Sequence, residues 1–131
     1  MNRGSDVVKK VKILVVEDDY VQFMSMEMVM KIWGYEVLGP VSSSEQVLES
    51  VRQNRPDLVL MDVNIQGCMD GIDTAKEILD KYKIPVMLIT GYALSELHHR
   101  LQSVKAAGFL MKPYDPQTLR SAIEALMNSP V

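Results

Sequence analysis

The sequence has little of what marks secreted or membrane-spanning proteins. Its 131 residues include a single cysteine, Cys68, which has no partner for an internal disulfide and favours a reducing, cytoplasmic setting. Its longest apolar runs, such as residues 86–89, fall far short of the ~20 residues that cross a bilayer. Residues 1–12 contain basic side chains without the apolar stretch of a signal peptide. We therefore expect no association with a membrane.

Charge of one sign is also scarce. The 14 Lys and Arg residues oppose 17 Asp and Glu residues, for a net charge of −3, and no basic cluster is interleaved with aromatic residues. Because nucleic-acid phosphates require a basic face, we expect no direct binding to DNA or RNA. Hydrophobic residues make up 47% of the chain, enough for one buried core, and the length suits one domain.

Five short apolar runs alternate with longer amphipathic segments. The runs are rich in β-branched residues and cover residues 11–16, 35–41, 58–61, 86–89 and 108–111. Apolar residues recur at three- and four-residue steps in the segments between them, which predicts helices. These helices cover about residues 20–33, a stretch from the serines at 42–44 to Asn54, a stretch from Gly71 to Tyr82, and residues 93–104 and 116–127. Glu45 stands at the spacing of a capping-box partner for those serines.

This alternation predicts an α/β fold with right-handed crossovers and a parallel sheet. Five units in one chain of this length favour a doubly wound, flavodoxin-like sheet of strand order 2-1-3-4-5, with helices on both faces. We expect residues 1–10 to be an N-terminal extension, 11–128 the domain and 129–131 a short tail.

Polar residues stand where the predicted strands end. Since parallel strands present their carboxyl ends at one edge of the sheet, these residues should share a pocket. The residues are Glu17, Asp18, Asp19, Asp62, Thr90 and Lys112.

Such a set of side chains suits phosphoryl chemistry. Clustered carboxylates repel one another and attract a hard divalent cation, and Mg²⁺ suits a site with few protein oxygens. A carboxylate oxygen can then attack phosphorus and form an aspartyl phosphate. A lysine and a hydroxyl would stabilise the charge that spreads over the phosphoryl oxygens.

Four segments resemble the motif blocks of response-regulator receiver domains of the chemotaxis-Y type. They are residues 15–19, 60–62, 89–91 and 109–113, and the resemblance extends over about residues 12–126. It implies a two-component signalling domain that catalyses its own Mg²⁺-dependent phosphorylation and dephosphorylation, and is otherwise no enzyme.

The resemblance also implies roles for single residues. Asp62 is the implied phosphoacceptor. Asp18 is an implied metal ligand, with Glu17 acting directly or through water, and the carbonyl oxygen of Asn64 completes the protein's share. Asp19 is implied to be peripheral.

Further implied roles concern the strand ends. Thr90 and Lys112 would bind the phosphoryl oxygens. Thr90 and Phe109 would form a switch that changes the partner-binding surface on phosphorylation, at the face built from residues 93–104, 108–111 and 116–127. Gly91 is the small residue that admits the phosphoryl group. The bond between Lys112 and Pro113 is expected to be cis.

The implied partners are a sensor histidine kinase or a phosphotransfer protein. We expect no output domain after the last predicted helix and assign no output partner. Homodimer formation, a role as phosphoryl sink or carrier, and whether the 131 residues are a whole protein or a domain of a longer one stay open. The loop after the acceptor departs from the family: it lacks the usual proline and is one residue longer. Gly67 is expected to supply the turn instead.

Other functions fit the sequence less well. A haloacid-dehalogenase-like phosphatase needs its nucleophilic Asp first in the chain and a second Asp two residues on, where Asn64 stands. A flavin or nucleotide binder needs a phosphate cradle after the first strand, where Glu17 and its acidic neighbours would repel the ligand. A degenerate receiver used only for docking would lack an essential residue, and none is missing.

Some chemically tempting residues have plain interpretations. His98 and His99 are expected on a solvated helix face and Cys68 in an unreactive loop position. The ten methionines are expected to fill the core, with a few exposed.

Overall fold

The computed structural model describes residues 10–91, 100, 104 and 108–128. The predicted helix at 93–104, the N-terminal extension up to residue 9 and the tail at 129–131 lie outside the described residues, apart from Arg100 and Val104, so those boundaries stay predictions. The elements are β1 (Lys12–Val16), α1 (Tyr20–Ile32), β2 (Glu36–Val41), α2 (Ser44–Asn54), β3 (Leu58–Asp62), α3 (Gly71–Tyr82), β4 (Val86–Thr90), β5 (Gly108–Met111) and α5 (Pro116–Asn128).

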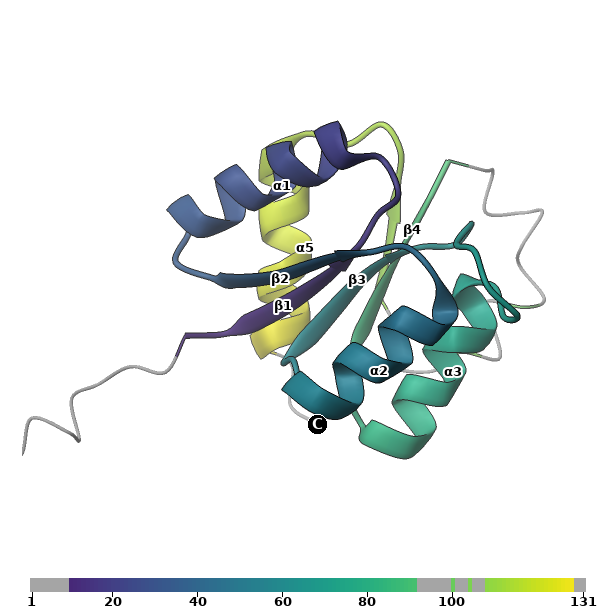
Figure 1. Cartoon of the computed structure of the whole chain (residues 1–131). Helices are drawn as coiled ribbons and strands as arrows, with labels where there is room; N and C mark the ends of the chain where they lie inside the picture. The colour runs from purple at the N-terminus through teal and green to yellow at the C-terminus, as the bar shows by residue number, and fades with distance from the viewer. Residues whose placement is uncertain (1–9, 92–99, 101–103, 105–107, 129–131) are drawn as a thin grey trace, which may run out of the picture.

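The strands form one parallel sheet of order β2-β1-β3-β4-β5, which confirms the predicted topology. Figure 1 shows α1 and α5 on one face of the sheet and α2 and α3 on the other. No helix among the described residues has the length and apolar character to span a bilayer. The doubly wound architecture follows because the sheet grows outward from β1 in both directions, which places α1 on one face and the consecutive helices α2 and α3 on the other.

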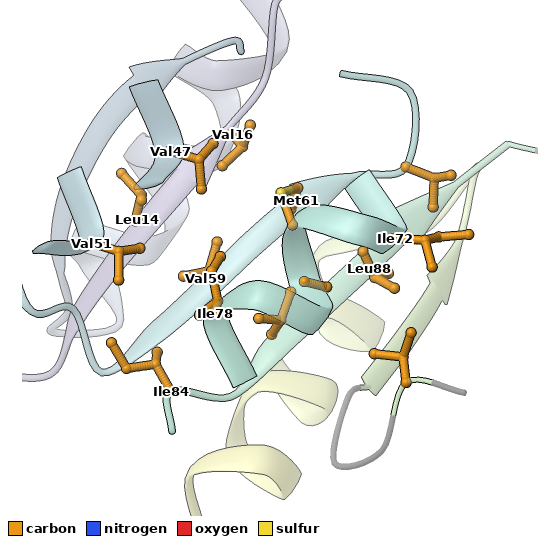
Figure 2. Close-up of a cluster of buried hydrophobic side chains, with 14 residues drawn as sticks. Leu14, Val16, Val47, Val51, Val59, Met61, Ile72, Ile78, Ile84 and Leu88 are labelled. Carbon is orange, nitrogen blue, oxygen red and sulfur yellow. The ribbon is translucent and has the colours of Figure 1, made fainter. Parts of the chain in front are cut away.

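Successive residues of a strand pack into two separate hydrophobic cores, one on each face of the sheet. Leu14, Val59 and Leu88 point to the face of α2 and α3, where Figure 2 shows them packed among the side chains of those helices. Ile13 and Met87 point to the face of α1 and α5. All of these side chains are at most 1% exposed. Fully burying one such side chain contributes about 1.5–3 kcal/mol, so the central strands are the stable frame that carries the site.

The helices begin and end at residues with a local reason. α1 ends before Gly34, whose φ of +97° suits a glycine just past a helix end. The cap of α2 differs from the prediction. Ser43 is the N-cap and accepts from the N–H of Gln46, whose side chain in turn accepts from the N–H of Ser42. The prediction of Glu45 as the capping-box partner is therefore wrong, since the cap starts one residue later and Glu45 is engaged elsewhere.

Strand β2 contains a feature that the sequence analysis did not anticipate. The peptide bond between Gly39 and Pro40 is cis, and the pairing of β1 with β2 shifts register between Leu14 and Val16. Gly39 has a φ of +112°, and a Cβ there would lie 2.6 Å from the carbonyl oxygen of Val15. Glycine is thus required at this close approach of two strands.

Candidate functional site

The candidate site lies where four strands end at one edge of the sheet. Asp62 is the last residue of β3 and Thr90 the last of β4. Glu17 follows β1 and Lys112 follows β5. Because all the strands are parallel, side chains far apart in the sequence reach the same edge.

Both carboxylate oxygens of Asp62 are held. Oδ1 accepts a hydrogen bond from the backbone N–H of Asn64 at 2.8 Å, and Oδ2 pairs with Nζ of Lys112 at 2.7 Å. The Asp62 side chain is 17% exposed, so solvent and a reactant can still reach it. This is a carboxylate with a fixed orientation and one adjacent cation, as an oxygen nucleophile requires.

Lys112 is fixed through its backbone as well as its side chain. Its N–H donates to the carbonyl oxygen of Thr90 at 2.8 Å, and its peptide bond to Pro113 is cis. Burial lowers the pKa of the Lys112 ammonium, but the hydrogen bond and charge of Asp62 outweigh burial, and the pKa is raised. The residue therefore stays positively charged at neutral pH beside the candidate nucleophile.

Glu17 is a buried carboxylate, 7% exposed, next to the exposed Asp18. Its Oε1 accepts a hydrogen bond from the N–H of Asp19 at 3.1 Å. Burial raises the pKa of the Glu17 carboxyl and the negative charge of Asp62 adds to the rise; the Asp19 N–H and Lys112 oppose it only in part. The raised pKa thus reflects mainly the loss of water around the carboxyl group, with the nearby Asp62 charge as a smaller cause.

Asp19 has a structural task. It is the N-cap of α1, and its Oδ1 accepts from the N–H groups of Val21 at 3.0 Å and Gln22 at 3.3 Å. These bonds satisfy donors that the first helical turn leaves open. Asp19 therefore caps the helix, and Glu17, Asp18 and Asp62 remain as the candidate carboxylates of the site.

The residues present supply the kind of donor atoms that a magnesium ion requires. Among residues 10–91, 100, 104 and 108–128, no three His, Cys, Asp or Glu side chains form a ready metal centre. The candidate donors are all oxygens: the carboxylates of Glu17, Asp18 and Asp62 and the carbonyl of Asn64. Mg²⁺ is usually held by one or two carboxylates plus waters and substrate phosphate, so this donor set suits it.

Thr90 and Phe109, the predicted switch pair, lie on the neighbouring strands β4 and β5. Thr90 is buried at 1% exposure, whereas Phe109 is 39% exposed and pairs with Leu88 in the register. A Cβ at Gly91 would meet nothing within 4 Å, so there is open space above the strand end. The segment that the switch was predicted to alter, residues 93–104, lies largely outside the described residues.

The loop between β3 and α3, residues 63–70, is fastened at both ends to other parts of the chain. Gly67 has a φ of +107°, in keeping with the turn expected of it. The sequence analysis missed the partners of this loop, which are Ser44 and Glu45 on α2 and Arg100. The carboxylate of Asp70 caps α3 and pairs with Arg100 at 2.6 Å. Nothing in the sequence spacing indicates these contacts.

The tempting residues behave as their plain interpretations predict where they are described. Cys68 is exposed, and its hydrogen bond to Glu45 raises the pKa of the thiol, which makes it a poorer nucleophile. Met26 and Met30 are buried while Met24 and Met28 are exposed. His98 and His99 lie outside the described residues.

An apolar groove adjoins the site on the side of α1. Its volume is about 510 Å³, and Lys112, Pro113 and Tyr114 line it together with one flank of α1. The neighbouring surface of α1 is unusually apolar for an outer helix face, which marks it as a candidate interaction surface. Its exposed side chains are Tyr20, Val21, Met24, Met28 and Ile32.

Comparisons with known proteins agree with this geometry. The model of the response regulator receiver domain matches residues 13–124. The transcriptional regulatory protein PdtaR of Mycobacterium tuberculosis is 32% identical over 113 residues, 86% of this chain and 55% of that protein. The sporulation initiation phosphotransferase F of Bacillus subtilis is 32% identical over 115 residues, 86% of this chain and 90% of that protein. The chain thus spans about half of the first relative and nearly all of the second.

Solved structures give the same answer. The receiver domain of a modulated diguanylate cyclase from Desulfovibrio desulfuricans superposes with a TM-score of 0.82 at 28% identity, covering 91% of this chain and 94% of that one. The receiver domain of a sensor histidine kinase from Pseudomonas aeruginosa, with magnesium in its active-site cleft, gives 0.80 at 25% identity, covering 92% and 100%. The chain therefore belongs to the response regulator receiver domain family.

Proposed function

We propose that Asp62 accepts a phosphoryl group from the phosphohistidine of a sensor histidine kinase or phosphotransfer protein, in a Mg²⁺-dependent reaction in the cytoplasm. The observation that carries the proposal is the fixed Asp62–Lys112 pair at the strand edge, 2.7 Å apart. Membership in the receiver family supports it. The chain itself supplies the nucleophile, so the reaction modifies this domain and no separate substrate.

The chemistry needs a bond exchange at phosphorus. A carboxylate oxygen of Asp62 attacks, an acyl phosphate bond forms, and the phosphorus–nitrogen bond to the donor imidazole breaks; that nitrogen retains the bonding electron pair. Lys112 would offer its charge to the phosphoryl oxygens, and the Thr90 hydroxyl would donate a hydrogen bond to one of them. Asp18, Asp62 and the carbonyl of Asn64 would hold Mg²⁺, with Glu17 acting directly or through water, and the ion would supply charge that neutralises the phosphoryl oxygens.

A surface next to the acceptor could contact the donor protein. The groove beside Lys112 and the exposed apolar side chains of α1 adjoin the acceptor, so a partner bound there would bring a phosphohistidine within reach of Asp62. We propose this surface as the contact for the donor. The output partner and a homodimer are not assigned by any described contact.

Covalent labelling tests the acceptor. With acetyl phosphate and Mg²⁺, the protein should gain one phosphoryl group that hydroxylamine removes, as an acyl phosphate requires. Asp62→Asn should gain none, and circular dichroism should report an intact fold. Intact-mass spectra showing unchanged modification in that variant would refute the assignment.

Thermal unfolding tests the binding of Mg²⁺. Mg²⁺ that binds only the folded state stabilises it by mass action, so millimolar Mg²⁺ should raise the melting temperature, and Asp18→Asn should abolish the rise. A melting curve indifferent to both Mg²⁺ and Mn²⁺ would remove the metal from the proposal.

A second function, phosphoryl carrier rather than switch, is favoured by one observation. The relative matched over 90% of its own length is a phosphotransferase. A beryllofluoride mimic of the phosphoryl group separates the two. In a switch, NMR shifts should spread from Asp62 through Thr90 to Phe109 and residues 93–104, and Thr90→Ala should confine them to the pocket. In a carrier they should never leave the pocket.

A further inference from the structure

The loop that follows the acceptor is bound to the start of α2 by its backbone. The N–H of Ser44 donates to the carbonyl oxygen of Gln66 at 2.8 Å, and the N–H of Gln66 donates to the carbonyl oxygen of Ser42 at 3.1 Å. Ser43 and Gln66 thus form an isolated parallel bridge outside the main sheet. A short extra strand pairing of this kind ties the loop to an element that starts more than twenty residues earlier.

Two side chains of α2 complete the attachment. Oε2 of Glu45 accepts from the backbone N–H of Cys68 at 3.1 Å and from its thiol at 2.8 Å. Oγ of the fully buried Ser44 accepts from the N–H of Met69 at 3.3 Å. A Cβ on Gly67 would overlap the Ser44 and Glu45 side chains and lie 2.9 Å from the Ser44 nitrogen, so the contact requires glycine there. We call Ser44 and Glu45 the α2 clamp.

Charge strengthens the α2 clamp at neutral pH. The hydrogen bonds from Cys68 lower the pKa of the Glu45 carboxyl to about 2, and Glu45 raises the pKa of the thiol. Glu45 is therefore an ionised acceptor and Cys68 a protonated donor, which is the stronger, charge-assisted form of the bond.

The clamped segment begins next to the reacting group. The N–H of Asn64 holds Oδ1 of Asp62, and Gln66 is only two residues further along the chain. The N–H of Val63 donates to the carbonyl oxygen of Ile89 at 2.9 Å, which fixes the loop on the strand side. Asn64 thus lies in a short span fastened on one side to β4 and on the other to the α2 clamp.

We propose that Ser44 and Glu45 are positioning residues for the acceptor site. They fix the loop that carries Asn64, and so set both the affinity for Mg²⁺ and the lifetime of the aspartyl phosphate. The proposal rests on the proposed function. It explains how a loop without the family's usual proline, and with one residue more, keeps a defined geometry beside Asp62.

The test compares α2 clamp variants with a neighbour on the same helix. Glu45→Ala removes the acceptor, and Cys68→Ala removes the thiol donor, which Cys68→Ser should restore. Glu49→Gln is the matched control, because Glu49 is exposed on α2 and, within the part of the chain that the structure describes, pairs only with Arg52 and Gln53. Amide hydrogen exchange of Cys68 and Met69 reports the attachment itself, without phosphodonor or metal.

We expect faster exchange at both amides in Glu45→Ala. We also expect the Kd for Mg²⁺ to rise about tenfold, which is the lower end of the range of affinity losses seen when groups that orient metal ligands are removed. The lifetime of the acyl phosphate should change several-fold, while Glu49→Gln should match the unmodified protein in all three measurements. Unchanged exchange, or faster exchange with Mg²⁺ affinity and lifetime within twofold, would overturn the proposal.

Failure of the proposed function gives a different result. If the unmodified protein forms no acyl phosphate but binds Mg²⁺, the acceptor assignment fails. The tenfold change in the Kd for Mg²⁺ then tests the positioning role of the α2 clamp by itself. If the unmodified protein binds no Mg²⁺, both proposals are overturned. Should Glu45→Ala fail to fold, Cys68→Ala and its serine counterpart carry the same comparison from the loop side.

Discussion

The two faces of the sheet are built differently. The face of α2 and α3 is packed with aliphatic side chains such as Val47, Val51 and Ile78, and both helices turn charged residues outward, with ion pairs such as that between Lys81 and Glu77. The face of α1 and α5 mixes aliphatic side chains with the buried methionines Met26, Met30 and Met87 and the aromatic ring of Phe23. Its helix α1 also leaves large apolar side chains in solvent.

This difference separates two tasks. Branched aliphatic side chains have few rotamers, so the face of α2 and α3 holds one geometry and can fasten the loop beside Asp62. Methionine is unbranched and adapts to its neighbours, and an exposed apolar helix face invites a partner. In the proposed function, one face would secure the position of the acceptor, while the other would offer a surface beside Lys112 through which the donor reaches it.

The largest effect should come from the aliphatic core. Met87 and Leu88 are adjacent on β4 and point to opposite faces. Leu88→Ala should lower the free energy of unfolding by about 2–5 kcal/mol, because a cavity is left in a closely packed site. Met87→Leu should cost less than about 1.5 kcal/mol, because the volume is kept. Urea unfolding measures both, and a loss in Met87→Leu as large as that in Leu88→Ala would contradict adaptable packing around Met87.

A smaller effect is expected where α3 meets the site. A Cβ on Gly71 would lie 2.5 Å from the carbonyl oxygen of Asp62 and 2.7 Å from Cα of Val63, and backbone atoms cannot move aside cheaply. Gly71→Ala should therefore cost about 1–3 kcal/mol. Gly91→Ala is the matched control, since its Cβ meets open space, and should stay within about 0.5 kcal/mol. Thermal and urea unfolding measure the stability of both variants, and a larger loss in Gly91→Ala than in Gly71→Ala would contradict the prediction.

The α1 surface should matter for the partner and hardly for stability. Replacing Met24 and Met28 together by Lys should slow transfer from a protein donor roughly tenfold, equivalent to ~1.4 kcal/mol, as expected when an apolar contact is lost. The rate with acetyl phosphate should be unchanged. Gln53→Lys, on the exposed side of α2, should alter neither rate. Equal slowing with acetyl phosphate would place the effect in the chemistry and not in docking.

The smallest effect concerns pH. Glu45 has a pKa lowered to about 2 from its ordinary 4.5, so its contribution to stability is present above pH 4.5 and is lost as the pH falls toward 2. The difference in melting temperature between the unmodified protein and Glu45→Gln should shrink from pH 6 to pH 2. A difference that grows on acidification would reverse the sign and contradict an ionised Glu45.

Much of the site was predictable because the ends of strands can be recognised in the sequence. A run of β-branched residues that stops at an acid or a lysine marks the end of a strand, and the alternation with helices predicts that parallel ends meet. The order of the sheet and the gathering of Asp62 and Lys112 at one edge follow from that local pattern. The cap of α2 was misplaced by one residue, because consecutive serines offer equivalent hydroxyls and only packing selects Ser43.

The sequence by itself determined the strands, their order and the two apolar faces, and it showed which polar residues stand at the strand ends. It could do so because hydrophobic periodicity, and the ending of helices and strands at glycine and proline, are local features of the chain. Tertiary structure alone decided that Glu45 holds Cys68 and that Arg100 holds Asp70. These bonds join residues 23 and 30 positions apart, and no periodicity links their partners. Their distances depend on how far each loop reaches once the helices are packed, which is a property of the folded core.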